Sequence, residues 1–218
     1  MTIKTVLCYG DSMSWGIIPG TRNRHAYEKR WTGILQSLLP AEVRVIEECL
    51  NGRTTAWDDP FRPKRNGGEL LLPILQSHSP LDLVILFLGT NDLQNMYGVG
   101  AYESSLGVAA LVDVMQKNVP EPMTAAPAII LVAPPRIVRP CGPMAEKFRG
   151  AEEKSEGFSR WYQRVAEERR CLFFDAAEVI SPSKVDGVHL DELQHRQFAL
   201  AIESCVTQAL GVRRSKDA

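Results

Sequence analysis

The apolar segment LDLVILFL at residues 81–88 is the feature that most restricts how this chain can fold. Asp82 is its only polar residue, so a strand formed here would present apolar side chains on both faces. Such strands are typical of parallel sheets that helices cover on both sides. Shorter strand-like runs that stop at turn-forming residues predict four further strands, at residues 6–9, 44–48, 128–133 and 171–175.

Segments with helical periodicity lie between these runs and after the last of them. They predict helices at residues 31–39, 68–76, 102–119 and 191–206, with Pro73 interrupting the second of them near its start. The connections are long enough to cross over the sheet, which allows successive strands to run parallel. This order predicts an α/β fold of three layers, with helices on both faces of a five-stranded parallel sheet. The chain has 218 residues, 44% of them hydrophobic, and we expect a single domain over residues 1–218.

Composition and charge argue against several classes of function. The chain has 25 basic and 26 acidic residues, which gives no long-range field to hold a nucleic acid. Its five cysteines are scattered without a Cys-x-x-Cys pair, so we expect neither a disulfide framework nor a metal site. There is no Gly-rich nucleotide-binding pattern, and we expect no cofactor. The first residues show no basic segment followed by a long apolar stretch, and no apolar run approaches membrane length, so we expect a cytoplasmic protein without membrane contact.

Ser12 is the first candidate catalytic residue. The apolar run at residues 6–9 ends at Gly10-Asp11-Ser12, so the serine follows the carboxyl end of a predicted strand. Open α/β sheets bind their ligands in the crevice at these strand ends. A serine nucleophile also needs a base that takes its proton and donors that stabilise the oxyanion.

The segment Asp186-Gly187-Val188-His189 can supply the base. A separation of three residues across a glycine-containing turn lets Asp186 reach Nδ1 of His189 and leaves Nε2 free to face Ser12. By itself this short pattern is more often a surface turn. It gains weight from the other loops that follow strand ends.

Three groups are candidate donors to an oxyanion: the backbone N–H groups of Ser12 and Gly52 and the side-chain amide of Asn91. Gly52 follows the second predicted strand and Asn91 follows the third. Each residue also has an ordinary structural interpretation, as a turn glycine or a helix cap. Their joint placement at successive strand ends favours a shared site.

The motifs Gly10-Asp11-Ser12, Gly52, GTND at residues 89–92 and DGVH at residues 186–189 resemble, in this order, the four blocks of the SGNH hydrolase superfamily, the GDSL-like esterases. Met13 stands where many members have leucine, which is a volume-conserving change. The longer segments GDSMSWG, RWTGIL and LDLVILFLGTNDL are similar to the subgroup of arylesterases and acyltransferases typified by the mycobacterial acyltransferase.

The resemblance implies a flavodoxin-like fold and hydrolysis of small-molecule esters through an acyl-serine. It also implies transfer of the acyl group to alcohols as well as to water, and a homo-oligomer such as an octamer with an apolar channel to the serine. We expect Trp15, Thr90 and Pro134 to line the substrate pocket. A core position is the alternative for Trp15. The polar segment at residues 19–30 is a candidate lid or partner contact.

Other functions stay open at this point. A carbohydrate O-acetylesterase, a lysophospholipase or a thioesterase would use the same catalytic residues with a different pocket. A metal-dependent phosphoesterase could recruit Asp58, Asp59, Asp92 and a histidine, although the sequence has no spaced His/Asp cluster such as a two-metal site requires. A catalytically silent ligand-binding module on the same fold is the alternative outside enzymes.

Overall fold

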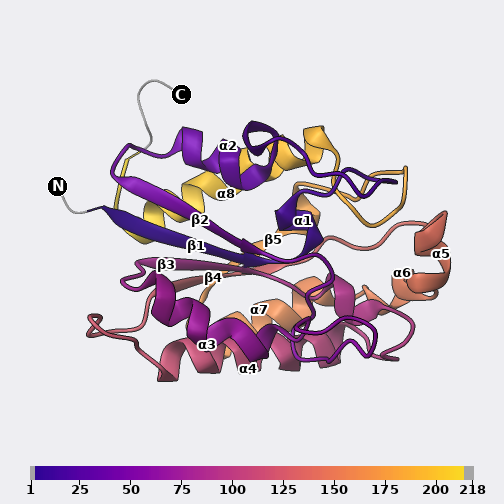
Figure 1. The fold of residues 1–218 in the computed structure, drawn as a ribbon, viewed down its shortest axis with the longest axis horizontal. Coiled ribbons are helices and arrows are strands. Elements are labelled where there is room, and N and C mark those ends of the chain that lie inside the picture. The colour runs from indigo at the N-terminus through magenta and orange to yellow at the C-terminus, as the bar shows by residue number, and fades with distance from the viewer. Residues whose placement is uncertain (1–2, 214–218) are drawn as a thin grey trace.

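A twisted sheet of five parallel strands forms the centre of the computed structural model, which describes residues 3–213 (Figure 1). The strand order is β2-β1-β3-β4-β5, the order of flavodoxin-like folds. The predicted fold class is therefore confirmed. The strands are β1 (Lys4–Gly10), β2 (Val43–Cys49), β3 (Leu83–Phe87), β4 (Ala128–Ala133) and β5 (Leu172–Asp175).

Helices cover both faces of this sheet. One face is covered by α2 (Trp31–Leu38) and α8 (Glu192–Leu210), and the other by α3 (Gly67–His78), α4 (Ala101–Lys117) and α7 (Phe158–Glu168) (Figure 1). Within residues 3–213, no helix combines the length and the apolar character needed to cross a membrane. The shorter elements are α1 (Ser12–Trp15), α5 (Pro143–Lys147) and α6 (Ala151–Lys154), with single turns η1 (Tyr27–Lys29), η2 (Thr90–Leu93) and η3 (Ala176–Glu178).

The sheet has a buried core on each face because successive side chains of a strand point to opposite sides. In β1, Val6 and Cys8 pack with the side chains of α2 and α8. Leu7 and Tyr9 pack on the opposite face with those of α3, α4 and α7. The apolar runs in the sequence identified β1, β3 and β4 correctly because both faces of these central strands are covered.

One expectation about the helices is wrong. Pro73 does not interrupt α3, which continues from Gly67 to His78. The proline lies on the exposed side of the helix. Leu71 and Leu75, by contrast, are fully buried against the sheet. Packing of this apolar face holds the helix together despite the missing backbone hydrogen bond.

The parallel arrangement gathers four chain segments at one edge of the sheet. The carboxyl ends of all strands meet there, and the residues that follow β1, β2 and β3 include Ser12, Gly52 and Asn91. The chain that follows β5 contributes Asp186 and His189. This edge lies on the right in Figure 1.

His195 makes the stability of the fold sensitive to acid. Its side chain is fully buried in α8, and its Nδ1 accepts a hydrogen bond from the Trp31 backbone N–H at 3.3 Å. Burial, with a smaller contribution from His25 and Arg30, lowers the pKa of His195 to about 3. Protonation is then favoured in the unfolded chain, so stability is lost as the pH falls below about 6.5.

Between pH 7 and pH 5 we expect this histidine to contribute a loss of about 2 kcal/mol in the free energy of unfolding. Asp11 and Asp92 have raised pKa values and shift the stability in the opposite direction, so wild type must be compared with His195→Asn by urea unfolding at each pH. The variant keeps an acceptor for the Trp31 N–H, and the partly exposed His78→Asn serves as the control. Parallel curves of stability against pH for wild type and His195→Asn would contradict the prediction.

Candidate active site

Ser12 is the first residue of α1, directly after β1. The preceding Asp11 caps this helix, because its Oδ1 accepts a hydrogen bond from the Met13 N–H at 2.9 Å. Its Oδ2 accepts a hydrogen bond from Nδ2 of Asn91 at 3.2 Å. Burial raises the pKa of Asp11 to about 6, against the lowering effect of these hydrogen bonds. Asp11 therefore fixes the loop that presents the serine.

Ser12, His189 and Asp186 form a continuous chain of hydrogen bonds. Nε2 of His189 lies 3.1 Å from Oγ of Ser12, and Nδ1 lies 2.7 Å from Oδ2 of Asp186. Because an ionised carboxylate can only accept hydrogen bonds, Nδ1 carries the ring proton and Nε2 accepts from the serine hydroxyl. This is the arrangement in which a histidine can take a proton from a serine.

The carboxylate of Asp186 accepts four hydrogen bonds. Besides His189 Nδ1, the donors are the backbone N–H groups of Val188, His189 and Gly20, at 3.0, 2.9 and 3.1 Å. Burial opposes ionisation, but these bonds and the attraction of His189 hold the pKa of Asp186 well below its usual range. Asp186 therefore stays charged and fixed in orientation.

The turn that carries Asp186 and His189 is held by the proline-rich loop PPRIVRPCGP at residues 134–143, which follows β4. Val138 donates its N–H to the Gly187 carbonyl at 3.0 Å, and Cys141 donates to the Asp186 carbonyl at 3.2 Å. Gly187 has a φ of +77°, and a Cβ there would lie 2.3 Å from the Val138 carbonyl oxygen. Only glycine fits this close approach of two backbone segments.

Two backbone donors are unused at the site. Within residues 3–213, the N–H groups of Ser12 and Gly52 have no hydrogen-bond acceptor. Gly52 adopts a left-handed conformation, with a φ of +80°. Both residues line the same cavity, so their N–H groups are available to a ligand.

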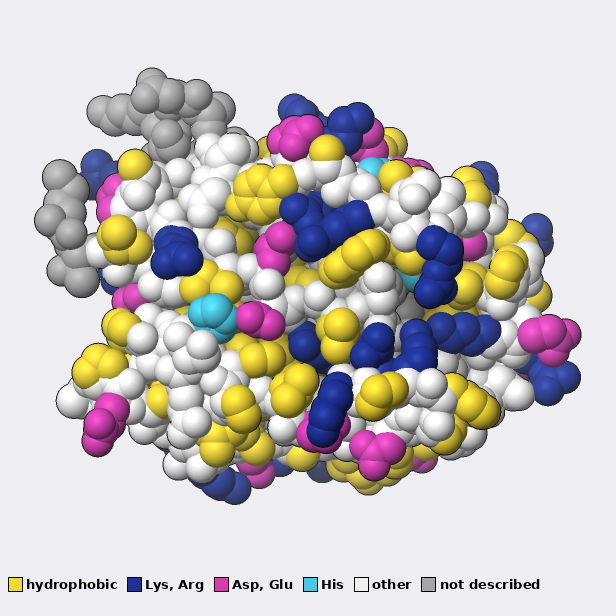
Figure 2. Space-filling model, viewed as in Figure 1, with side chains coloured by type: hydrophobic (Ala, Val, Ile, Leu, Met, Phe, Trp, Pro, Cys, Tyr) yellow, Lys and Arg dark blue, Asp and Glu magenta, His cyan; other side chains and the backbone are white. Residues whose placement is uncertain are grey.

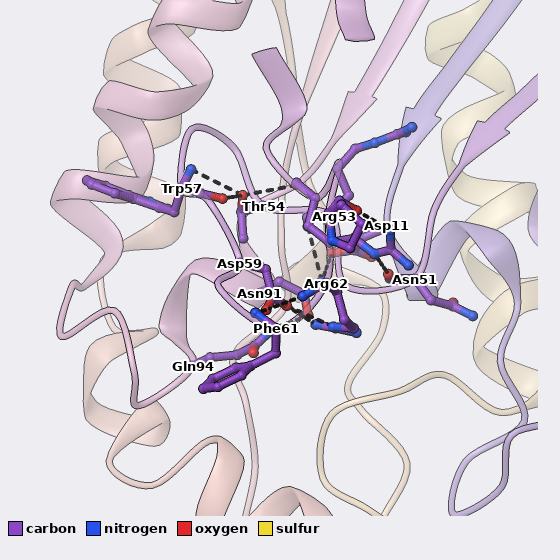
Figure 3. A network of polar contacts seen from close by, with 12 residues as sticks. Asp11, Asn51, Arg53, Thr54, Trp57, Asp59, Phe61, Arg62, Asn91 and Gln94 are labelled. Carbon is purple, nitrogen blue, oxygen red and sulfur yellow. Dashed lines mark hydrogen bonds and ion pairs between the residues drawn. The ribbon is translucent and has the colours of Figure 1, made fainter. Parts of the chain in front are cut away.

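The amide of Asn91 lies between the loops that follow β1 and β2. Its Nδ2 donates to Asp11 Oδ2 and to the Arg53 carbonyl, each at 3.2 Å, and its Oδ1 accepts from Gln94 at 2.8 Å (Figure 3). Gln94 fixes which side of the amide carries the nitrogen. The two donated bonds are long, so Nδ2 can exchange one of them for a stronger acceptor.

The cavity over Ser12 has a volume of about 240 Å³ and is lined by residues from five segments. They include all five predicted residues of the triad and the oxyanion site: Ser12, Gly52, Asn91, Asp186 and His189. The remaining lining residues are Ile17, Gly20, Thr21, Arg22, Asn51, Arg62, Pro143, Met144, Lys147 and Phe148.

Three residues expected in the pocket are not among its lining residues. The Trp15 ring stacks with the guanidinium group of Arg24, whose Cζ lies 4.8 Å from the ring centroid. Thr90 is buried, with Oγ1 3.9 Å from Sδ of Met13. Pro134 lines a different groove, next to α7.

The cavity walls that sequence reasoning missed come from irregular segments and from the short helix α5. Residues 17–22 form one wall, Arg62 and Asn51 another, and residues 143–148 a third. The only sequence signal for the first and third of these walls was that their residues lie in or next to the polar segment 19–30 and the proline-rich loop. Neither segment has a periodicity that could indicate which side chains face the cavity.

The carboxylates of the metal-dependent alternative do not converge. Asp59 pairs with Arg62, Asp92 accepts hydrogen bonds from Thr55 and Ser104, and Asp58 accepts from Asn66. In the described part of the chain, no three His, Cys, Asp or Glu side chains are arranged to hold a metal ion.

Comparisons with known proteins agree with this geometry. A model of the GDSL-like lipase/acylhydrolase family matches residues 8–197. No curated protein matches the chain. A structure of the native aryl esterase of M. smegmatis is 38% identical with a TM-score of 0.90, and the match covers 95% of this chain and 100% of that one.

Two structures from Sinorhizobium meliloti are similar to a comparable degree. A carbohydrate acetylesterase family member is 38% identical with a TM-score of 0.92, over 96% of this chain and 100% of that one. Est24, a carbohydrate acetylesterase, is 37% identical with a TM-score of 0.89, over 94% of this chain and 99% of that one.

Proposed function

Because this chain belongs to the GDSL-like lipase/acylhydrolase family, we propose that it is a serine esterase for short-chain carboxylic esters, with Ser12 as the nucleophile. The observation that carries the proposal is the hydrogen-bonded chain from Ser12 Oγ through His189 to Asp186. The cavity volume of about 240 Å³ is below the range of about 300–1,000 Å³ typical of sites for drug-sized ligands. It favours a small acyl group.

In the proposed reaction, His189 Nε2 takes the Ser12 proton while Oγ attacks the ester carbonyl. Negative charge then develops on the carbonyl oxygen, and the N–H groups of Ser12 and Gly52 and the amide of Asn91 donate to it. His189 returns the proton to the leaving alkoxide, which leaves an acyl-serine. Water or an alcohol attacks this intermediate in the second half, with His189 again as the base.

Two more specific functions are proposed, and they differ in the alcohol part of the substrate and in the molecule that accepts the acyl group. An arylesterase that also transfers acyl groups to alcohols is the first candidate, from the likeness to the M. smegmatis enzyme. A carbohydrate O-acetylesterase is the second, from the likeness to the S. meliloti structures and the small cavity. Both would use the same catalytic residues.

The test is turnover of p-nitrophenyl acetate, butyrate and octanoate by wild type and Ser12→Ala, with and without a primary alcohol. We expect rates to fall with chain length, activity to depend on Ser12 and ester product to form from the alcohol. An acetylated sugar, assayed for acetate release, tests the second candidate. Full activity of Ser12→Ala would show that the nucleophile is misassigned.

We expect Asn91→Ala to lower kcat by about 10²- to 10³-fold, because an oxyanion donor acts mainly in the transition state. The measurement is the steady-state hydrolysis of p-nitrophenyl acetate, with kcat and KM separated. Asn118→Ala removes an exposed amide at the end of α4 and is the matched control. A change confined to KM would mean that Asn91 binds substrate rather than the oxyanion.

Three expectations from the sequence stay proposals: the single domain over residues 1–218, the cytoplasmic location and the homo-oligomer such as an octamer. Light scattering of the purified protein measures the oligomeric state directly.

A further inference from the structure

Three cations line the cavity over Ser12: Arg22, Arg62 and Lys147, called here the mouth cations. Figure 2 shows Lys and Arg side chains gathered around a hollow in the right half of the face in view. Asp186 is the only carboxylate among the lining residues, and His189 and three backbone N–H groups already engage it. The cavity therefore carries an excess of positive charge beside the reacting groups, although the whole chain has a formal charge of -1.

Arg62 presents unused donors next to Gly52. Its Nε and Nη2 bind Oδ2 of Asp59 at 2.8 and 2.6 Å, while Oδ1 of Asp59 accepts from the backbone N–H groups of Phe61 and Arg62 (Figure 3). Asp59 thus holds one edge of the guanidinium, and Nη1 has no partner within the described residues. A Cβ on Gly52 would lie 2.6 Å from Nη1, so the guanidinium packs directly against this glycine.

Lys147 and Arg22 have no counter-ion among the described residues. Within residues 3–213, neither side chain lies within ion-pair distance of a carboxylate. Burial, followed by repulsion from Arg62, lowers the pKa of Lys147 to about 8, and Arg22 contributes in the same direction. Nearby Asp59 and Asp11 only partly offset these effects. Holding a half-buried ammonium next to two guanidinium groups is unfavourable, and a bound anion would remove much of this cost.

We propose that this cavity takes ester substrates that carry an anionic group, a carboxylate, phosphate or sulfate, and that Arg22, Arg62 and Lys147 bind this group. The inference rests on the ester hydrolysis proposed above and names its substrate class. Guanidinium and ammonium groups form their strongest hydrogen bonds with such anions. A neutral ester of the same shape would leave Nη1 of Arg62 without an acceptor, and Lys147 and Arg22 without a counter-ion among the described residues.

The test compares matched anionic and neutral esters. For an anion on the alcohol part, the pair is 4-acetoxybenzoate and 4-acetoxybenzamide. For an anion on the acyl part, the pair is methyl hydrogen succinate and methyl 4-methylpentanoate, followed by methanol release. In at least one pair we expect the anionic ester to have a kcat/KM about tenfold or more above the neutral one. This ratio should fall as salt screens the charges.

Variants assign this preference to the cations. Lys147→Met and Arg22→Gln are each expected to reduce the ratio of anionic to neutral kcat/KM by about tenfold. Arg44→Gln is the control, because Arg44 is exposed near the amino end of β2, away from the cavity. A ratio of anionic to neutral kcat/KM of one or less in both pairs would overturn the inference. If the neutral esters are still hydrolysed and this activity depends on Ser12, the proposed function stays intact.

A binding measurement separates the two proposals further. Calorimetry on Ser12→Ala with 4-acetoxybenzoate and 4-acetoxybenzamide reports the anion site without turnover. Tighter binding of the anion that is lost in Ser12→Ala/Lys147→Met supports the site, even if no ester is hydrolysed by wild type. Equal binding within this pair, and equally within the pair of methyl hydrogen succinate and methyl 4-methylpentanoate, would overturn it.

Discussion

Replacing Ser12 with alanine is expected to lower kcat for p-nitrophenyl acetate by at least about 10⁴-fold. Without Oγ there is no acyl-enzyme, and His189 has no hydroxyl to deprotonate. The remaining donors can still polarise the ester, so a small residual rate above the uncatalysed reaction is expected. Stopped-flow assays should also lose the initial burst that reports acyl-enzyme formation.

Ser14→Ala is the matched control for this variant. Ser14 belongs to the same short helix and is fully buried, but its Oγ has no hydrogen-bond partner in the described structure. Its removal should leave kcat within a few-fold of wild type and the fold intact. A serine-directed organophosphonate should label wild type and Ser14→Ala but not Ser12→Ala. Labelling of Ser12→Ala at wild-type rate would place the nucleophile elsewhere.

Replacing Asp186 with asparagine is expected to lower kcat by about 10⁴-fold through the histidine tautomer. One side of the Asp186 carboxylate faces the N–H groups of Val188 and His189, and the other faces His189 Nδ1 and Gly20 N–H. On the first side the amide nitrogen of asparagine would face two backbone N–H donors, but on the second side it would face only one, from Gly20. The nitrogen therefore takes the second side, next to His189 Nδ1. There it donates to Nδ1, so the proton moves to Nε2, which then cannot act as the base toward Ser12.

The readout is kcat at fixed pH together with the tautomer of His189, which ¹⁵N NMR of labelled histidine reports directly. Asp191→Asn is the control, because Asp191 lies two residues after His189 and caps α8, a role that asparagine fills equally well. We expect the control to keep its activity. A tautomer unchanged in Asp186→Asn, combined with a large loss of kcat, would contradict this mechanism.

The positions of the catalytic candidates could be predicted because they depend on local patterns. A parallel strand that is buried on both faces has a continuous apolar sequence, and the residue that ends this apolar run can be identified in the sequence. Ser12 and Asn91 each follow such an end, whereas Gly52 follows β2, an edge strand in which polar and apolar residues are mixed. The three strands lie side by side in the sheet. Parallel strands bring their carboxyl ends to one edge whatever the intervening loops contain.

The charge and shape of the cavity could not be predicted in this way. They depend on contacts between distant segments, such as the hydrogen bond from Gly20 to Asp186, which are 166 residues apart. The same holds for Arg62, which Asp59 orients against Gly52, and for Lys147 in α5. Pro134 and Trp15 fit the sequence pattern of pocket residues equally well, yet they lie outside the cavity lining.

The sequence by itself determined the layered α/β fold, the order of the site loops and the four polar residues and one glycine that meet at one edge of the sheet. Only the tertiary structure decided the hydrogen-bond distances within the triad, the unused N–H groups and the mouth cations. The physical reason is that strands and helices follow from the periodicity of neighbouring side chains. Irregular loops take their conformation from hydrogen bonds and ion pairs with segments far away in the chain.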